Sequence, residues 1–351
     1  MASGPYVSVI VYAYRRRQYL LDAVRSVLAQ DVDRSLFEVV VVKDFTDPEI
    51  DAELARGSPT VRVITGDLRV TGEMLSTAVE QARGEVICFL DDDDRFRPGK
   101  VGGIAELFRS DPSLGFVRNG SLAITAQGEP LPSWDRISQQ PRQSFDLLPS
   151  ASPSYALRKA LHFRAQCNTS LMSFRAGALR PWLPYLRRIP AAQDSFLFFL
   201  ATMTGMRIHV EASRWNDYRF HPSAGHSMVG EAGTQAHLVE FLRHLPTAQI
   251  MQEALHQHPG HRLAARFAEC FELENTAEIF LLDPKRTWSL DGWLRLGRSA
   301  VWRREMFIGL YWALSAYKAL RPVPGSRLFQ RRLAGYHRRI AEVDDVRAPA
   351  G

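Results

Sequence analysis

Four consecutive aspartates, Asp91 to Asp94, directly follow the apolar run Val86 to Leu90. An apolar run of this length between Gly84 and the Pro98-Gly99 pair predicts a buried strand. Adjacent carboxylates repel one another, so a cluster at the end of a buried strand needs either water or a cation around it. Carboxylate oxygens suit a hard divalent cation, and a solvated acidic turn is the alternative interpretation.

The first 90 residues alternate between short apolar runs and helical patterns. Strands are predicted at residues 7–11, 37–42, 61–64 and 86–90, and helices at 20–28 and 74–79. Apolar strands separated by helices predict an α/β fold, in which a mostly parallel sheet is covered by helices on both faces. Ligands of such sheets bind beyond the carboxyl ends of the strands. Asp44 and the Asp91 to Asp94 run both follow predicted strands, at this kind of edge.

Composition limits the class of protein. The chain has 351 residues, of which 46% are hydrophobic, so it is long enough for one large domain and an appendage. Its three cysteines form no CxxC pair, which argues against a zinc site or a disulfide framework and favours a reducing compartment. The first residues lack the pattern of a secretory signal, and no apolar run is long enough to span a membrane. We therefore expect a cytoplasmic protein.

The basic character of the chain is concentrated at its C-terminal end. Residues 285–351 hold 14 Lys and Arg against 5 Asp and Glu, a balance of +9, which leaves −3 for the residues before them. The uncharged segment Met306 to Tyr317 is too short, at about 1.5 Å per residue, for a hydrocarbon core of about 30 Å. It either packs on the preceding domain or lies in a membrane interface. We find no nucleic-acid-binding motif, so an anionic membrane surface at the inner face is the predicted partner of residues 285–351.

Four local patterns resemble, in order and spacing, those of family 2 glycosyltransferases with the GT-A fold. They are Val7 to Gln30, Val39 to Asp44, Ala82 to Asp94, and Gln193-Asp194 followed by the apolar run Phe196 to Leu200. The Asp91 to Asp94 segment, which looks like the DxD motif of the family, is the most specific part. The resemblance implies a GT-A catalytic domain over residues 1–228, with a Rossmann-like, mostly parallel sheet. A nucleotide-binding half would cover about 1–115 and an acceptor half about 116–228, and a helical, basic region would follow at 229–351.

The resemblance also implies an activity. A metal-dependent, inverting glycosyltransferase would move a sugar from a nucleoside diphosphate sugar to a hydroxyl of a saccharide or lipid-linked acceptor, in glycan or glycolipid assembly. Transfer to a polyprenyl phosphate is a related alternative. A sugar nucleotidyltransferase would need a Gly-rich phosphate loop after the first strand, and Tyr14 to Arg17 contains no glycine. A membrane-bound protein that binds nucleotides without turnover is the remaining alternative.

The acidic run and a later histidine supply the predicted metal site. Asp93 is the expected ligand of Mn²⁺ or Mg²⁺, and Asp91 would orient the ribose or a metal-bound water. Asp92 is a weaker nucleotide-binding candidate, for which a solvated structural role comes first. Asp94 would brace the turn or face the sugar. By resemblance, His221 in the segment Tyr218 to His221 would complete the metal shell or contact the diphosphate.

The remaining predicted site residues bind the nucleotide base and activate the acceptor. By resemblance Asp44 contacts the base, although Lys43 stands where the family often has an acidic residue and would pair with Asp44, contact a phosphate or lie on the surface. Tyr12 would border the base or simply pack. Asp194 begins an apolar helical run, where it would serve either as the general base for the acceptor hydroxyl or as a helix cap. Gln193 replaces the more usual glutamate before it.

Overall fold

The chain folds around one nine-stranded sheet. The structure is a computed structural model, and it describes residues 4–14, 16–57, 59–132, 140–221, 230–283, 285–302, 309, 312–316 and 318. The strands are β1 (Val7–Ala13), β2 (Phe37–Lys43), β3 (Val61–Thr65), β4 (Val86–Asp91), β5 (Arg95–Phe96), β6 (Leu114–Ile124), β7 (Phe145–Leu147), β8 (Met172–Arg175) and β9 (Arg207–Arg219). Their order is β3-β2-β1-β4-β8-β6-β9-β5, and β7 pairs with β9. Strands β1 to β4 are parallel to one another, whereas β8 is antiparallel to both β4 and β6.

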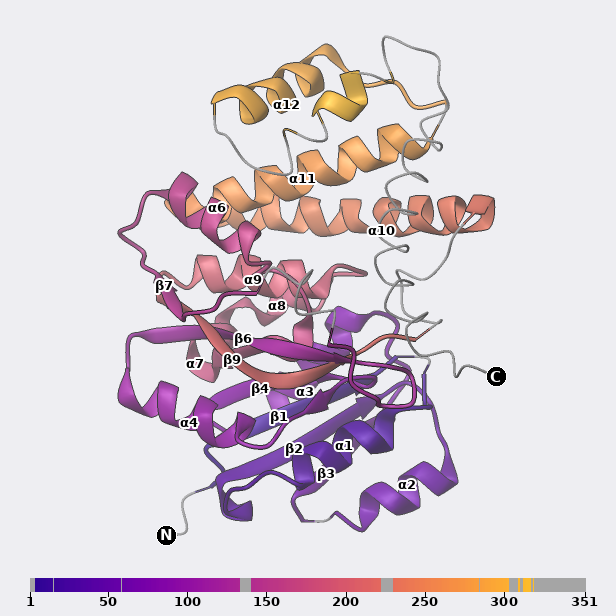
Figure 1. The fold of residues 1–351 in the computed structure, drawn as a ribbon, viewed down its shortest axis with the longest axis vertical. Helices are drawn as coiled ribbons and strands as arrows, with labels where there is room; N and C mark the ends of the chain where they lie inside the picture. Colours follow the sequence, from indigo (N-terminus) through magenta and orange to yellow (C-terminus); the bar gives the residue numbers. More distant parts are fainter. Residues whose placement is uncertain are drawn as a thin grey trace.

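Helices cover both faces of this sheet (Figure 1). They are α1 (Leu20–Leu28), α2 (Pro48–Ala55), α3 (Thr71–Gln81), α4 (Lys100–Ser110), α6 (Pro153–His162), α7 (Ala176–Leu179), α8 (Leu183–Leu186), α9 (Gln193–Met203), α10 (Gly230–Gln257), α11 (Arg262–Leu282) and α12 (Leu290–Trp302). Because successive strand side chains face opposite ways, Val9 and Val11 of β1 share a core with α1, α2 and α4, while Ile10 shares one with α3 and α9. The predicted α/β fold with its two helical layers is confirmed.

The parallel register brings three strand ends together. On β1, Tyr12 is level with Asp91 of β4, and Ala13 is level with Lys43 of β2. Strand β1 connects outward through β2 to β3, while β4 lies on its other side, so the strand order reverses at β1. Crevices at such reversals are the usual ligand sites of open α/β sheets. The acidic run therefore leaves β4 at the position in the sheet that favours ligand binding.

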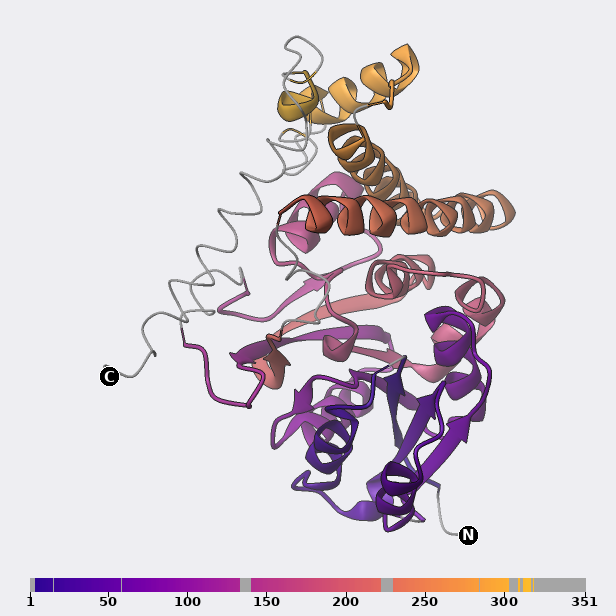
Figure 2. The same cartoon turned by 90° about the vertical axis from the view of Figure 1, so that its right-hand side faces the viewer.

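The helices after the sheet are part of the same core. Figures 1 and 2 show α10 and α11 stacked above α9, with α12 farthest from the parallel strands. Phe198 of α9 contacts Phe267 of α11 edge to face, with 5.1 Å between ring centroids. The predicted boundary near residue 228 falls within residues 222–229, outside the described residues. It therefore stays a prediction.

Part of the segment Met306 to Tyr317 lies within the described residues. Residues 312–316 are helical, and Leu314 packs against Ala277 and Leu281 of α11. The described part of this segment thus contacts the protein, as one of the two sequence-based alternatives expects. Among the described helices, none has the length and apolar composition needed to cross a membrane.

A buried glutamate secures the ends of β1, β2 and β4 opposite to the acidic run. Glu38 is 1% exposed, and it accepts hydrogen bonds from the Ser8 hydroxyl (2.7 Å) and from the Arg83 amide (2.6 Å) and Nε (2.9 Å). The Gly84 amide donates to the Ser8 hydroxyl at 2.8 Å, and a Cβ at Gly84 would lie 2.6 Å from the Ser8 nitrogen. Burial acts to raise the pKa of Glu38, but these hydrogen bonds outweigh it and hold the pKa below its usual value.

We predict that Glu38→Gln lowers the free energy of unfolding by about 1–3 kcal/mol at pH 7, because it weakens several bonds to one buried acceptor. A carboxylate with a depressed folded-state pKa stabilises the fold above its unfolded pKa, and this contribution is lost as the pH falls through the folded pKa. Urea unfolding at several pH values should therefore show the gap between variant and wild type narrowing below about pH 4. Glu53→Gln, at a partly exposed carboxylate of α2 paired with Arg25, is the control and should change stability little. A gap that is constant with pH would contradict this role for Glu38.

Candidate active site

Three of the four aspartates converge after β4. One carboxylate oxygen from each of Asp91, Asp93 and Asp94 lies within 4.8 Å of the others, while Asp92 is outside this group. Asp91 ends β4, and a turn follows in which the Asp94 amide donates to the Asp91 carbonyl at 3.2 Å. Asp92 and Asp94 are only 2% and 1% exposed. The interpretation of the run as a solvated turn is therefore wrong, as is the solvated role considered for Asp92.

Burial and mutual repulsion shift the pKa values of this cluster. Burial, followed by the charges of Asp94 and Asp93, raises the pKa of Asp91 well above its usual value. Burial likewise raises the pKa values of Asp92 and Asp94 to about 7. It acts in the same direction on Asp93, but His221 and Arg16 outweigh it and hold the pKa of Asp93 below its usual value. Three crowded oxygen donors that resist simultaneous ionisation fit a hard divalent cation, which would remove the repulsion.

An arginine and a histidine, far apart in the sequence, reach the acidic run. Arg16 contacts Asp92 at 2.5 Å and Asp93 at 2.6 Å, one guanidinium nitrogen to each carboxylate. His221 Nε2 lies 3.0 Å from Asp93 Oδ2, the same oxygen that Arg16 contacts. The structure thus brings His221 beside the predicted metal ligand Asp93, but the group of three carboxylates does not include it, and its role stays a prediction. Arg16 was missed as a site residue, and its only sequence signal is its place in the basic loop after β1.

The end of β9 holds the backbone of the acidic turn. Arg219 is 3% exposed, and its amide donates to Asp94 Oδ1 at 2.9 Å while its Nε donates to the Asp93 carbonyl at 2.7 Å. Its guanidinium also pairs with Asp22 and lies over the Tyr19 ring, 4.5 Å from the centroid. Asp94 thus braces the turn, which is one of the two alternatives that the sequence offered for it. Arg219 itself acts as a structural anchor.

Tyr12 lies between β4 and the start of α9. Its hydroxyl donates to Asp91, and Gln193 Nε2 donates to the Tyr12 oxygen at 3.3 Å. Burial and the neighbouring Asp91 charge raise the pKa of Tyr12 well above its usual value, so the hydroxyl keeps its proton and remains a donor. Tyr12 packs in the core and also contacts a predicted nucleotide-binding carboxylate.

Asp194 lies in the first turn of α9, after an N-cap residue, Ala192, with φ +57°. Asp194 Oδ1 accepts the Ser195 amide at 2.7 Å, and Oδ2 accepts the Asn168 amide at 3.1 Å. Asp194 is therefore not the N-cap residue itself, but it accepts a first-turn amide of α9, so the helix-capping alternative and the general base both stay predictions. The side chain of Asn168 also donates to Asp94 Oδ2 at 3.1 Å, which links Asp194 to the acidic cluster through one residue.

Lys43 and Asp44 end β2 without joining the carboxylate group. Asp44 is partly exposed immediately after the strand, and the group of three aspartates does not include it. Lys43 is fully buried and contacts Asp51 of α2 at 2.8 Å and the Phe45 carbonyl at 2.5 Å. Of the three alternatives for Lys43, the surface position is therefore wrong, and the carboxylate that the structure pairs with it is Asp51 of α2 instead of Asp44.

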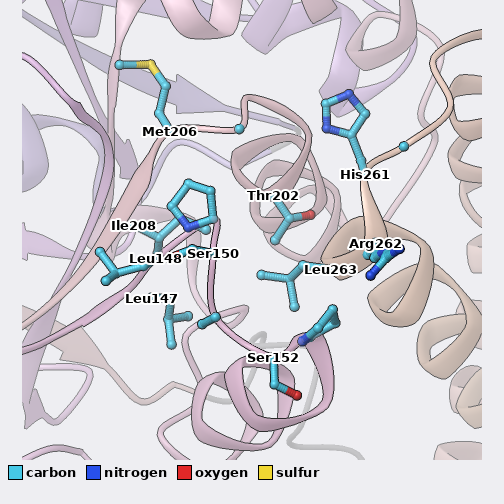
Figure 3. A pocket seen from close by; sticks show the side chains of 15 residues that line it. Leu147, Leu148, Ser150, Ser152, Thr202, Met206, Ile208, His261, Arg262 and Leu263 are labelled. Atoms are coloured by element: carbon cyan, nitrogen blue, oxygen red, sulfur yellow. The ribbon is translucent and has the colours of Figure 1, made fainter.

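A separate hollow of about 380 Å³ lies among the β7–α6, α9–β9 and α10–α11 connections (Figure 3). Its lining includes Leu147, Met206, Ile208 and Leu263, with His261 and Arg262 from the start of α11. None of Asp91 to Asp94 lines it. The aspartate cluster, which supplies the carboxylate oxygens of the candidate site, is therefore distinct from this hollow.

Comparisons with known proteins point to glycosyltransferases. The family model described as glycosyl transferase family 2 matches residues 8–162. An uncharacterised glycosyltransferase of Nostoc sp. is 33% identical over 117 residues, which cover 32% of this chain and 36% of that protein. The chain thus spans little more than a third of the length of this curated relative.

Two solved structures share the fold over most of this chain. S. aureus TarS 1-349 in complex with UDP-GlcNAc has a TM-score of 0.51 at 18% identity and covers 90% of this chain and 91% of its own. The mannosyltransferase PcManGT from Pyrobaculum calidifontis, in complex with GDP-Man and Mn²⁺, has a TM-score of 0.50 at 16% identity and covers 93% and 87%. At these identities the likeness concerns the fold alone.

We predict that Asp93→Asn weakens Mn²⁺ binding by about 10-fold or more, because it removes a charged oxygen from the group of three. Titration of Mn²⁺ followed by electron paramagnetic resonance of the free ion measures this without substrate. Asp92→Asn is the matched control, since Asp92 is an adjacent carboxylate with the same Arg16 partner and lies outside the group. Equal losses in the two variants would contradict the assignment of the group as the metal site.

Proposed function

The chain carries a family 2 glycosyltransferase domain over residues 8–162, and from this premise we propose that it transfers a sugar from a nucleoside diphosphate sugar to an acceptor hydroxyl, with inversion. The observation that carries the proposal is the cluster of Asp91, Asp93 and Asp94 at the sheet reversal. The two similar structures, one in complex with UDP-GlcNAc and the other with GDP-Man, support a donor of this class.

The donor diphosphate would lie over the acidic turn. When bound by Asp91, Asp93 and Asp94, Mn²⁺ or Mg²⁺ would neutralise the charge that develops on the leaving diphosphate. Arg16 would hold the turn through Asp92 and Asp93 and offer its exposed edge to the phosphates. His221, against Asp93, would border the same phosphates. Tyr12 and Asp44, at the ends of β1 and β2, would border the ribose and the base.

Asp194 would take the proton of the acceptor hydroxyl during its attack on the sugar. Its two oxygens accept backbone amides, which fixes the orientation of the carboxylate. A carboxylate oriented in this way at a helix start is suited to general base catalysis. A polyprenyl phosphate acceptor, already ionised, would need this proton transfer much less.

The donor can be identified by melting curves with UDP or GDP in the presence of Mn²⁺, since a ligand bound only by the folded state raises the melting temperature. Release of the diphosphate from UDP-GlcNAc and GDP-mannose then measures turnover. We expect a melting shift that requires both nucleotide and Mn²⁺. Binding without any turnover, to water, sugar hydroxyl or lipid phosphate, would contradict the proposed enzyme.

We predict that Asp194→Asn loses about 10²-fold or more in kcat with a hydroxyl acceptor, because it removes the base. Asparagine keeps only one acceptor oxygen, so one of the two backbone amides loses its partner and we expect a small fall in melting temperature. The donor affinity should be retained. Asp146→Asn, which alters a partly exposed carboxylate of β7 paired with Arg207, is the control. A variant that keeps its hydroxyl-transfer rate would place the base elsewhere. A variant impaired with hydroxyls but active with lipid phosphate would identify the phosphate as the acceptor.

We propose that the C-terminal helices hold the enzyme at an anionic membrane surface, where a lipid-linked acceptor would be presented. Leu290 and Leu294, one turn apart on α12, are 75% and 57% exposed. The exposed Lys285, Arg286 and Arg298 flank this apolar pair. Apolar side chains beside basic ones favour the interface of an anionic bilayer.

We predict that replacing Leu290 and Leu294 together with glutamate reduces co-sedimentation with anionic liposomes, because both the apolar contact and the charge balance are lost. Val239→Glu is the control, since Val239 is an exposed apolar residue of α10, 48% exposed, outside this helix. Salt should weaken wild-type binding through the electrostatic part alone. Absence of wild-type sedimentation at low salt would contradict a membrane partner.

A further inference from the structure

The first two residues of α9 each reach one aspartate of the cluster through a single intermediate residue. Gln193 donates to the Tyr12 oxygen at 3.3 Å, and the Tyr12 hydroxyl donates to Asp91. Asp194 accepts the Asn168 amide at 3.1 Å, and the Asn168 side chain donates to Asp94 at 3.1 Å. Two short hydrogen-bonded paths thus join the start of α9 to the group of three carboxylates.

Asn168 makes this connection from an uncommon backbone conformation. Its φ is +65°, in the region that side chains other than glycine rarely adopt. From there its amide faces Asp194, its side-chain nitrogen faces Asp94, and its side-chain oxygen accepts the Ser170 amide at 2.8 Å. Ala192, directly before α9, also has a positive φ, of +57°. Backbone strain of this kind persists where the surrounding contacts enforce it, and it gathers at functional sites.

The path through Tyr12 has a direction. The side-chain amide of Gln193 donates a hydrogen bond to the Tyr12 oxygen, so the Tyr12 hydroxyl donates its own hydrogen bond to Asp91. A glutamate at position 193 would be an acceptor and would compete with Asp91 for that proton. The glutamine therefore suits a tyrosine that must donate toward the acidic cluster.

We propose that Asn168 is a positioning residue that fixes Asp194 relative to Asp94, so that the base and the metal-binding carboxylates keep one geometry. This inference rests on the proposed role of Asp194. Asp94 has a second anchor in the Arg219 amide at 2.9 Å, whereas the backbone amide of Asn168 supplies one of the two hydrogen bonds that hold Asp194. The Asn168 side chain, bonded to Asp94 and to the Ser170 amide, holds that backbone amide in position. Loss of the side chain should therefore release the amide that orients Asp194, while Asp94 keeps its bond to Arg219.

The test is a double-mutant cycle on diphosphate release from UDP-GlcNAc and GDP-mannose with Mn²⁺. Asn168→Gly keeps the positive φ and removes the side-chain anchor; it should lower kcat by about 10²-fold, as a small misplacement of a catalytic group does, with donor KM nearly unchanged. In the Asp194→Asn background the same change should cost almost nothing more, because the residue it positions is already gone. Asn168→Asp keeps the bond to the Ser170 amide but turns a donor toward Asp94 into a repelling carboxylate, and it should fail in the same way.

Arg164→Gly is the matched control, because Arg164 is another non-glycine residue with positive φ, +52°, close in sequence to Asn168. It should keep wild-type turnover. Losses that multiply in the double variant, or wild-type kcat in both Asn168 variants, would overturn the proposal. Failure of the base assignment is recognised separately, since Asp194→Asn alone would then keep its rate. Unfolding curves of each variant show that the rates refer to folded protein.

Discussion

The arrangement of this protein's site depends on the electrostatic cost of burying four adjacent carboxylates at the end of one strand. Buried charge is stable only when it is paired or neutralised. Partners come from segments far apart in the chain: Tyr12 on β1, Arg16 after it, Asn168 before β8, Arg219 at the end of β9 and His221 just after it. Each of these contacts places another segment of the chain beside the end of β4. The residues that pair with the buried aspartates are therefore the same residues that form the site.

The sheet makes these contacts possible. Strand β9 runs for 13 residues, pairs along β6 and then meets β5, so its last residues arrive beside the turn that β4 and β5 enclose. Arg219 at its end bonds the backbone of that turn, and His221 follows two residues later. At the opposite end of the parallel strands, Glu38 binds the Arg83 amide and the Ser8 hydroxyl and holds β1, β2 and β4 level. Because the strands are parallel, the register fixed at that end also places Tyr12 beside Asp91 at the other end.

The parts predicted from sequence are those with a local pattern. Apolar runs located β1 to β4, and the helical pattern located α9, because burial imposes a period on the sequence. The charges around the aspartates have no such signal. Arg16 and Asn168 lie 76 and 74 residues from their aspartate partners. Lys43 is buried because Asp51 of α2 lies beside it, and nothing within the strand predicts that contact. Tertiary pairing of polar groups therefore had to come from the structure.

A charge count separates this cluster from a structural ion-pair network. Within the described residues, Arg16 is the guanidinium paired to carboxylates of the acidic run, since Arg219 binds the run through its amide and a backbone carbonyl and pairs its guanidinium with Asp22. His221 contacts Asp93 of the run and also packs against the Tyr19 ring. Arg16 thus supplies one permanent positive charge against four aspartates. Burial, followed by the charges of neighbouring aspartates, raises the pKa values of Asp91, Asp92 and Asp94. A network kept only for stability would be expected to balance its charges, because uncompensated buried charge is strongly destabilising. A bound divalent cation would reduce this imbalance, which favours the proposed binding site over a purely structural role for the acidic run.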